Sequence, residues 1–172
     1  MKNSFLAEPC REYKNSFENY VLAYKRAKDN YYYDKYKKAL EDFDEYLEEL
    51  DNYSKGTGRT LEDVATTTLW LIEDNEVVGV VRIRHWEVEC AGHIGYDISP
   101  EYRNRGYGTR ILKLALRRAA KLGIDNAIVN CRIDNTASKK IIESNNGILL
   151  GIIYDETEKE YLYKYSIQTT LK

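Results

Sequence analysis

The sequence predicts a mixed α/β fold, with helices that flank a twisted sheet of about six to seven strands and with an N-terminal helical extension. Two observations support this prediction. Apolar residues recur at helical spacing through residues 1–55, whereas short apolar or alternating runs, typical of strands, dominate residues 64–167. Within that second region strands and helices alternate in the middle and strands cluster at both ends, which favours a mixed sheet. The 172 residues fit one domain, so we take residues 1–172 as a single domain with a helical segment at 1–55 and a core at 64–167.

Two helices are expected in the N-terminal segment. One apolar stripe runs from Phe17 to Tyr24, and a second runs from Tyr36 to Leu50. Asp29-Asn30 separates the two helices, and Asp34 is expected to cap the second. Tyrosine is abundant here, and its rings either pack the helices against the sheet or line a ligand pocket. The acidic run from Asp42 to Glu49 is either a solvated helix face or a surface that attracts a cationic ligand.

The core begins with a pair of strands. The glycine-containing stretch Ser54–Arg59 is expected to form a loop. Strands are predicted at Thr67–Ile72 and Val77–Trp86, joined by a turn at Asp74-Asn75. Residues 91–98 form the next predicted strand, which leads into a segment with two glycines.

The rest of the chain alternates between helix and strand before it closes on two strands. Gly123 is expected to end a helix over residues 106–121 in the C-cap manner. The other predicted elements are a buried strand at Ala127–Val129, a helix at Thr136–Asn145 that breaks at Gly147, and strands at Ile148–Tyr154 and Tyr161–Ile167 across an acidic turn at Asp155–Glu158.

The stretch Arg103–Gly108 predicts an anion-binding site. A strand precedes it, and the apolar helical pattern of residues 111–119 follows it. A chain that turns through glycines into a helix presents unpaired backbone N–H groups and the positive end of the helix dipole. Phosphates suit such a site, and Arg103 and Arg105 add positive charge.

Composition excludes several other classes of function. The net charge of −2 argues against nonspecific nucleic-acid binding, which needs a basic excess. No apolar run approaches the roughly 20 residues that span a bilayer, and the N-terminus has no apolar stretch of signal-peptide length, so we expect a cytoplasmic protein without membrane contact. Cys10, Cys90 and Cys131 are too scattered for a disulfide framework or a metal site. A homodimer is left open.

Several motifs resemble one known superfamily. Arg-x-x-Gly-x-Gly at residues 103–108 resembles the acyl-CoA pyrophosphate loop of the GCN5-related N-acetyltransferase (GNAT) superfamily. Asn130–Ser138 resembles that superfamily's fifth strand and the Asn-x-x-(Ala/Ser) opening of the next helix, and Ile141–Gly147 resembles the end of that helix. Arg82–His85 and Gly92–Tyr96 are similar to a poorly characterised bacterial branch of predicted acetyltransferases.

The resemblance covers residues 64–167 and implies the acyl-CoA N-acyltransferase fold, with acetyl-CoA as co-substrate. In the superfamily the pantetheine arm lies along the fourth strand, so the backbones of Asp97 and Ile98 are expected to contact it. Asn135 is expected to contact the same arm, although simple N-capping also explains it. The implied cofactor-binding residues are Asp97, Ile98, Arg103, Asn104, Arg105, Gly106, Tyr107, Gly108, Thr109, Asn135 and Ser138.

The resemblance also implies catalytic residues, with one departure. Ser138 is placed to offer its hydroxyl to the cofactor sulfur. Many members have a tyrosine four residues further on that protonates the departing thiolate, but here Ile142 stands at that position. Solvent, Ser138, Tyr107 or another tyrosine is then needed as the general acid.

The expected general base is His93, because a histidine titrates near neutral pH. Strand alternation places His93 on the same face as Gly95 and Asp97. The alternative is a strand histidine satisfied by a backbone carbonyl. His85, Glu87 and Glu89 are rivals for the base and are the expected residues on the acceptor side, since they lie toward the end of the preceding strand and its loop.

These residues predict an acetyl-CoA-dependent N-acetyltransferase. Its acceptor would be a primary amine of a small molecule, peptide or protein, which attacks the thioester directly. The alternative is a non-catalytic acyl-CoA-binding module, favoured by the missing tyrosine at Ile142. A nucleotide-binding protein of another kind is disfavoured, because no Lys-Ser/Thr pair follows the glycines.

Overall fold

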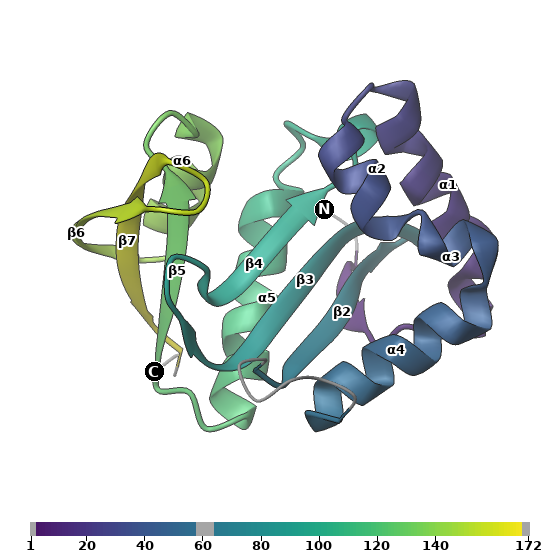
Figure 1. Cartoon of the computed structure of the whole chain (residues 1–172), viewed down its shortest axis with the longest axis horizontal. Coiled ribbons are helices and arrows are strands. Elements are labelled where there is room, and N and C mark those ends of the chain that lie inside the picture. The colour runs from purple at the N-terminus through teal and green to yellow at the C-terminus, as the bar shows by residue number, and fades with distance from the viewer. Residues whose placement is uncertain (1–2, 58–63, 170–172) are drawn as a thin grey trace.

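The computed structural model describes residues 3–57 and 64–169 (Figure 1). None of the helices in these two segments combines the length and the apolar run that a bilayer crossing requires. The helices are α1 (Lys14–Arg26), α2 (Asn30–Tyr36), α3 (Lys38–Glu41), α4 (Phe43–Lys55), α5 (Tyr107–Lys121) and α6 (Thr136–Glu143), with short 3₁₀ turns at Arg11–Tyr13 and Pro100–Tyr102. The strands are β1 (Phe5–Ala7), β2 (Thr66–Glu73), β3 (Glu76–Val88), β4 (Gly92–Ile98), β5 (Asn126–Arg132), β6 (Ile148–Asp155) and β7 (Glu160–Gln168).

Seven strands confirm the predicted mixed α/β class and divide into two antiparallel sheets. One sheet has the order β1-β2-β3-β4, and the other has the order β5-β7-β6. The crossover from β4 through α5 to β5 joins the two sheets. Figure 1 shows β4 and β5 running in the same general direction and diverging toward their carboxyl ends. The short strand β1, which pairs with β2, was not predicted from the sequence.

The larger sheet is covered on both faces. Alternation along β2 directs Leu69 and Leu71 toward α5, and it directs Trp70 and Ile72 toward the N-terminal helices. All four side chains are buried, which explains why this strand is apolar at successive positions. The ring of Phe17 on α1 stacks on Trp70 with ring centroids 4.3 Å apart. The N-terminal segment is therefore packed onto the sheet as its second layer.

The N-terminal region has four helices where the sequence predicted two. Asp29 caps α2 by accepting the Tyr32 N–H at 3.4 Å, and Asp42 caps α4 by accepting the Glu45 N–H at 2.9 Å. The prediction that Asp34 is the cap was wrong. Asp34 lies inside α2, because the helix begins as soon as the earlier aspartate is available, and it instead forms an exposed ion pair with Lys37.

Most other boundaries agree with the sequence. Asp74 and Asn75 both have left-handed backbone angles in the tight turn between β2 and β3. Gly123, with φ +82°, follows α5 as expected. Of the loop predicted at Ser54–Arg59, the first two residues belong to α4, whose C-cap is Gly56, and residues 58 and 59 lie outside the described segments.

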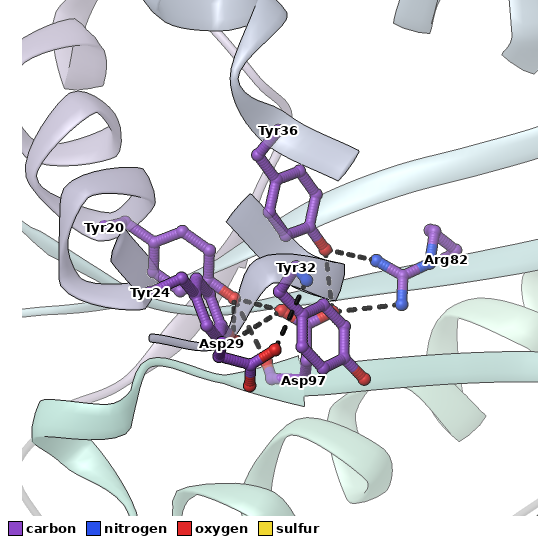
Figure 2. Close-up of polar contacts among 7 residues, drawn as sticks. All are labelled: Tyr20, Tyr24, Asp29, Tyr32, Tyr36, Arg82 and Asp97. Atoms are coloured by element: carbon purple, nitrogen blue, oxygen red, sulfur yellow. Dashed lines mark hydrogen bonds and ion pairs between the residues drawn. The ribbon is translucent and has the colours of Figure 1, made fainter. Parts of the chain in front are cut away.

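A buried carboxylate ties the N-terminal helices to the sheet. Asp97, near the end of β4, is 6% exposed (Figure 2). Its Oδ2 accepts the hydroxyls of Tyr20 and, at 2.8 Å, of Tyr24, both on α1. Its Oδ1 accepts the hydroxyl of Tyr36 on α2 at 2.7 Å and forms an ion pair with Arg82 Nη2 on β3 at 3.0 Å. These tyrosines therefore pack the helices on the sheet, which is the first of the two roles expected for them.

We predict that Asp97→Ala lowers the free energy of unfolding by about 3–5 kcal/mol, because it leaves the guanidinium of Arg82 and three hydroxyls without their acceptor. Urea denaturation checks this. Asp34→Ala is the matched control, since that exposed aspartate has one surface partner and its loss changes stability by less than about 0.5 kcal/mol. A similar small change for Asp97→Ala contradicts the role given to the carboxylate.

Candidate active site

A cleft opens between β4 and β5. The strands approach closely at Gly92, where an added methyl group would lie 2.5 Å from the carbonyl oxygen of Ile128. Only glycine permits this contact, and its φ of +64° also favours glycine. Beyond this point the strands separate (Figure 1). Residues from both sheets line a cleft of about 260 Å³ there. It is lined by Tyr31, Tyr32, Lys35, Arg82, Arg84, Cys90, Ile94, Gly95, Tyr96, Asn130, Cys131, Arg132, Asn135, Ser138, Asp155, Glu160 and Leu162.

The edge of β4 that faces β5 carries backbone hydrogen-bonding groups. Ser99 N–H donates to the Val78 carbonyl at 3.0 Å, which sets the alternation of the β3–β4 ladder. Antiparallel pairing then turns the backbone groups of Ile94, Tyr96 and Ile98 toward the opposite edge. An extended ligand with amide groups can add to such an edge as an extra strand.

Asp97 and Ile98, the two β4 residues expected to contact the cofactor, differ in the direction that their backbone groups face. The backbone groups of Ile98 face away from β3, toward the β5 side. Its carbonyl accepts a hydrogen bond from Arg103 Nε at 3.2 Å. Asp97 turns its backbone toward Val80 of β3, and its side chain is enclosed by the tyrosines of α1 and α2. Cofactor contact stays a prediction for both residues, and the geometry favours Ile98.

The N-terminus of α5 has the features of an anion site. Gly106 is its N-cap with φ +81°, and no side chain caps the helix. The first backbone bond of the helix runs from Arg110 N–H to Gly106 O at 3.1 Å, so the N–H groups of Tyr107, Gly108 and Thr109 have no partner within it. A methyl group on Gly108 would collide with Ile141 of α6, so this glycine serves helix packing.

The two arginines of the loop have different surroundings. Arg103 stacks over the ring of Tyr24 with its Cζ 5.8 Å from the centroid, and its Nη2 lies 3.4 Å from Asp29. It therefore fastens the loop to the N-terminal helices. Arg105 is exposed over Tyr102 and retains freedom to meet an anion. The roles of the predicted loop residues, Asn104 among them, stay predictions.

Asn135 and Ser138 lie together at the start of α6 and both line the cleft. The Asn135 side chain caps α6 by accepting the Ser138 N–H at 3.0 Å, which is the capping alternative considered from the sequence. Ile142 is fully buried in the core cluster beside α5, so this position contributes packing and no proton donor.

Tyr96 is a candidate functional residue that the sequence did not identify. Its hydroxyl is buried in the cleft and has no hydrogen-bond partner among the described residues. Burial raises the pKa of this hydroxyl, while the neighbouring Ser138 side chain acts in the opposite sense. The phenol therefore keeps its proton at neutral pH. On β4 its alternation with Ile94 and Ile98 indicates a core residue, so no local signal could have singled it out.

His93 connects the two sheets. Its Nδ1 accepts the backbone N–H of Ile128 on β5 at 3.0 Å, so a neutral ring carries its proton on Nε2 and offers no free lone pair. Burial lowers the pKa of His93, partly opposed by Glu87. This contact corresponds to the alternative considered from the sequence, a histidine satisfied by the backbone. The backbone partner is an N–H donor, whereas a carbonyl was expected. The general-base role stays a prediction, and this geometry weighs against it.

The other predicted residues on the acceptor side lie outside the cleft lining. His85 Nε2 contacts the Thr67 hydroxyl at 2.8 Å, and burial lowers the pKa of the ring. Glu87 accepts from Lys164 Nζ at 2.6 Å, and Glu89 is exposed in the turn before β4. The structure does not bring these three side chains to the cleft; their roles stay predictions.

A comparison with protein-family models matches residues 14–147 to the acetyltransferase (GNAT) domain. The chain belongs to this GNAT acetyltransferase family. The match begins within α1, so the family region includes the tyrosine-rich helices that carried little of the resemblance in the sequence. No curated protein sequence matched the chain.

Solved structures share the fold at low sequence identity. A ribosomal-protein alanine acetyltransferase from Vibrio fischeri aligns with a TM-score of 0.73 at 14% identity, over 98% of this chain and 94% of that one. RimJ from Mycobacterium smegmatis, in complex with a CoA disulfide, aligns with a TM-score of 0.73 at 14% identity, over 95% and 80%. The microcin self-immunity acetyltransferase MccE, in complex with acetyl-CoA and AMP, gives 0.68 at 15% identity, over 98% and 93%.

The family assignment confirms the expected fold and makes the protein an N-acetyltransferase with acetyl-CoA as co-substrate. The structure offers suitable groups for that molecule. The unpartnered N–H groups at the start of α5 suit its pyrophosphate. The outward edge of β4 suits the amide-containing arm, and Tyr96 places an unpartnered hydroxyl in the cleft.

We predict that Gly106→Val abolishes the rise in melting temperature that acetyl-CoA gives the wild-type protein, because a branched side chain strains the left-handed backbone of the N-cap and so displaces the N–H groups at the start of α5. Gly123→Val is the matched control. It imposes the same backbone strain, with φ +82° in open space at the other end of α5, and should retain the shift. An intact shift in Gly106→Val removes the loop from the cofactor site.

A second prediction concerns His93. His93→Ala should lower the free energy of unfolding by about 1–3 kcal/mol, because the Ile128 N–H loses its acceptor. Denaturation and turnover are measured together. If His93 is instead the general base, turnover falls by about 10² to 10⁴ with little change in stability. That outcome would contradict a purely structural role.

Proposed function

We propose that this protein transfers the acetyl group of acetyl-CoA to a primary amine of a small molecule, peptide or protein by direct attack of the amine on the thioester. One observation carries the proposal. The outward edge of β4 passes Tyr96 and Ser138 in the cleft and continues within a few residues into the anion-binding start of α5. Groups suited to a pyrophosphate, an amide-containing arm and a reacting centre therefore follow one another along a single strand and loop.

Binding residues have distinct tasks in this proposal. The N–H groups of Tyr107, Gly108 and Thr109 hold the pyrophosphate, with Arg105 adding charge. The backbones of Tyr96 and Ile98 hold the arm and direct an N–H toward the carbonyl to be attacked. When bound, acetyl-CoA supplies an activated acyl group on a thiol leaving group.

Tyr96 provides the proton for the departing sulfur. As the C–N bond to the amine forms and the C–S bond breaks, the sulfur needs a proton and the attacking nitrogen must lose one. The Tyr96 hydroxyl is buried and protonated and has no hydrogen bond of normal geometry among the described residues, and the Ser138 side chain lies beside it to orient or relay the proton. It thus fills the role that Ile142 cannot perform. Water accepts the proton from the nitrogen in this proposal, because His93 Nδ1 already accepts the Ile128 N–H and Glu87 and Glu89 lie outside the cleft lining.

A cytoplasmic location and a homodimer also stay predictions from the sequence. The exposed apolar side chains of Ile148 and Ile152 on β6 support the second. This strand is the outer member of the β5-β7-β6 sheet, and an apolar unpaired edge favours association.

The test begins with a panel of amines and detection of released thiol. With a reactive amine in hand, Tyr96→Phe should lower turnover by about 10² to 10⁴ and leave the acetyl-CoA thermal shift unchanged, because only the acidic proton is removed. Tyr107→Phe is the control, since it keeps the backbone N–H of α5 and alters a second tyrosine considered as the acid.

Two results would contradict the proposal. Near-normal turnover in Tyr96→Phe, or a large loss in Tyr107→Phe alone, removes the acid role from Tyr96. A thermal shift with acetyl-CoA but no thiol release with any amine favours the binding-module alternative over the enzyme.

A further inference from the structure

Cationic side chains form one wall of the cleft. Lys35 on α2 and Arg82 and Arg84 on β3 all line it, next to Tyr31 and Tyr32. These two rings are the part of the tyrosine-rich segment that lines this cleft. The three cations therefore come from two elements that the Asp97 network holds together (Figure 2).

The two guanidinium groups lie over the same residue of β4. A methyl group added to Gly95 would be 3.7 Å from Arg84 Nη1 and 3.8 Å from Arg82 Nη2. A side chain at residue 95 would contact both guanidinium groups, so the glycine leaves them uncovered on this side of the cleft. Gly95 immediately precedes Tyr96, so a group bound here lies beside the proposed acid.

Arg82 is held in place while part of its hydrogen-bonding capacity stays unused. Its Nη1 donates to the Tyr36 hydroxyl, and its Nη2 pairs with Asp97. Its Nε is buried and has no hydrogen-bond partner within the described residues. Asp97 already accepts three hydroxyls, so its negative charge is shared with several donors.

Lys35 experiences the field of these neighbours. Desolvation at the cleft wall first, and then the positive charge of Arg82 and of Arg84, lowers the pKa of its ammonium group, while Asp97 and the solvent exposure of this side chain oppose the shift. Its Nζ lies 5.6 Å from the ring centroid of Tyr31. An anion placed among these groups would relieve the repulsion between like charges.

The acidic groups of the cleft stand on its other side. Glu160 pairs with Arg132 at 3.1 Å, and Asp155 accepts the backbone N–H groups of Thr157 and Glu158 in its turn. The acidic face of α4 lies outside the cleft lining, where Lys38 pairs with two of its glutamates.

We propose that the acceptor carries an anionic group, a carboxylate or a phosphate, a few bonds from its amine, and that Lys35 and Arg82, with Arg84 beside them, bind that group over Gly95. This inference rests on the proposed acetyl transfer and names its substrate class. Guanidinium groups suit planar or tetrahedral oxyanions, and Lys35 adds a point charge.

Matched pairs of acceptors test the inference by thiol release from acetyl-CoA. Each pair differs only in the anion: an α-amino acid with its amide, and phosphoethanolamine with ethanolamine. Spermidine serves as a polycationic probe. We expect kcat/KM to be at least about tenfold higher for the anionic member of one pair, and the preferred pair distinguishes carboxylate from phosphate. Equal rates within both pairs, or a preference for spermidine, overturn the inference.

A variant gives an independent readout. Lys35→Gln should lower kcat/KM for the preferred anionic acceptor about tenfold or more, while its neutral partner and the acetyl-CoA thermal shift are unaffected. Lys37→Gln is the matched control, because this lysine is exposed and pairs with Asp34 on the surface. A loss that is equal for both members of the pair, or absent, contradicts anion recognition by Lys35.

The two proposals fail in different ways. Acetylation of neutral and anionic amines at equal rates refutes only the substrate class. Absence of thiol release from every probe, with the acetyl-CoA thermal shift retained, refutes the acetyl transfer itself and the substrate class with it.

Discussion

The buried carboxylate of Asp97 is the interaction on which the arrangement of this molecule depends. An ionised group in a protein interior is tolerated only when charge and hydrogen bonds compensate for lost water. Here the donors come from α1, α2 and β3, so satisfying one carboxylate fixes three elements against the end of β4. The hydroxyls of Tyr20 and Tyr36 are fully enclosed, and burial raises their pKa well above the ordinary value, so they remain donors at any physiological pH.

This arrangement links the core of the protein to its cleft. Tyr36 and Lys35 are neighbours on α2, so the helix turn that brings the hydroxyl of one to Asp97 brings the ammonium of the other to the cleft wall. Arg82 participates on both sides, since it pairs with the carboxylate and also lines the cleft. Structure and recognition therefore share the same side chains, and a change in the network alters both stability and the electrostatic field of the cleft.

Local patterns predicted the elements better than the site. Short apolar or alternating runs and the Asp74-Asn75 turn were sufficient to place the strands of the described residues except β1, because backbone preference and burial are set by near neighbours. The three tyrosine partners of Asp97 are 61 to 77 residues away in sequence, and no periodicity encodes such pairs. Tyr96 carried the alternation of a core residue. A backbone-satisfied His93 was one of the alternatives, but no pattern indicated that its partner would be the N–H of Ile128 on another strand.

The close approach of Gly92 and Ile128 has a mechanical consequence. The two sheets are in close contact at this point, and β4 and β5 diverge beyond it (Figure 1). The contact therefore lies at the closed end of the cleft. If one sheet rotates relative to the other about the Gly92–Ile128 contact, the resulting displacement grows with distance along the strands. A backbone adjustment that is too small to disturb the core would change the width of the cleft at its open end, where ligands of different size enter. Residues next to the Gly92–Ile128 contact, far from the open end, would thus influence how wide the cleft opens.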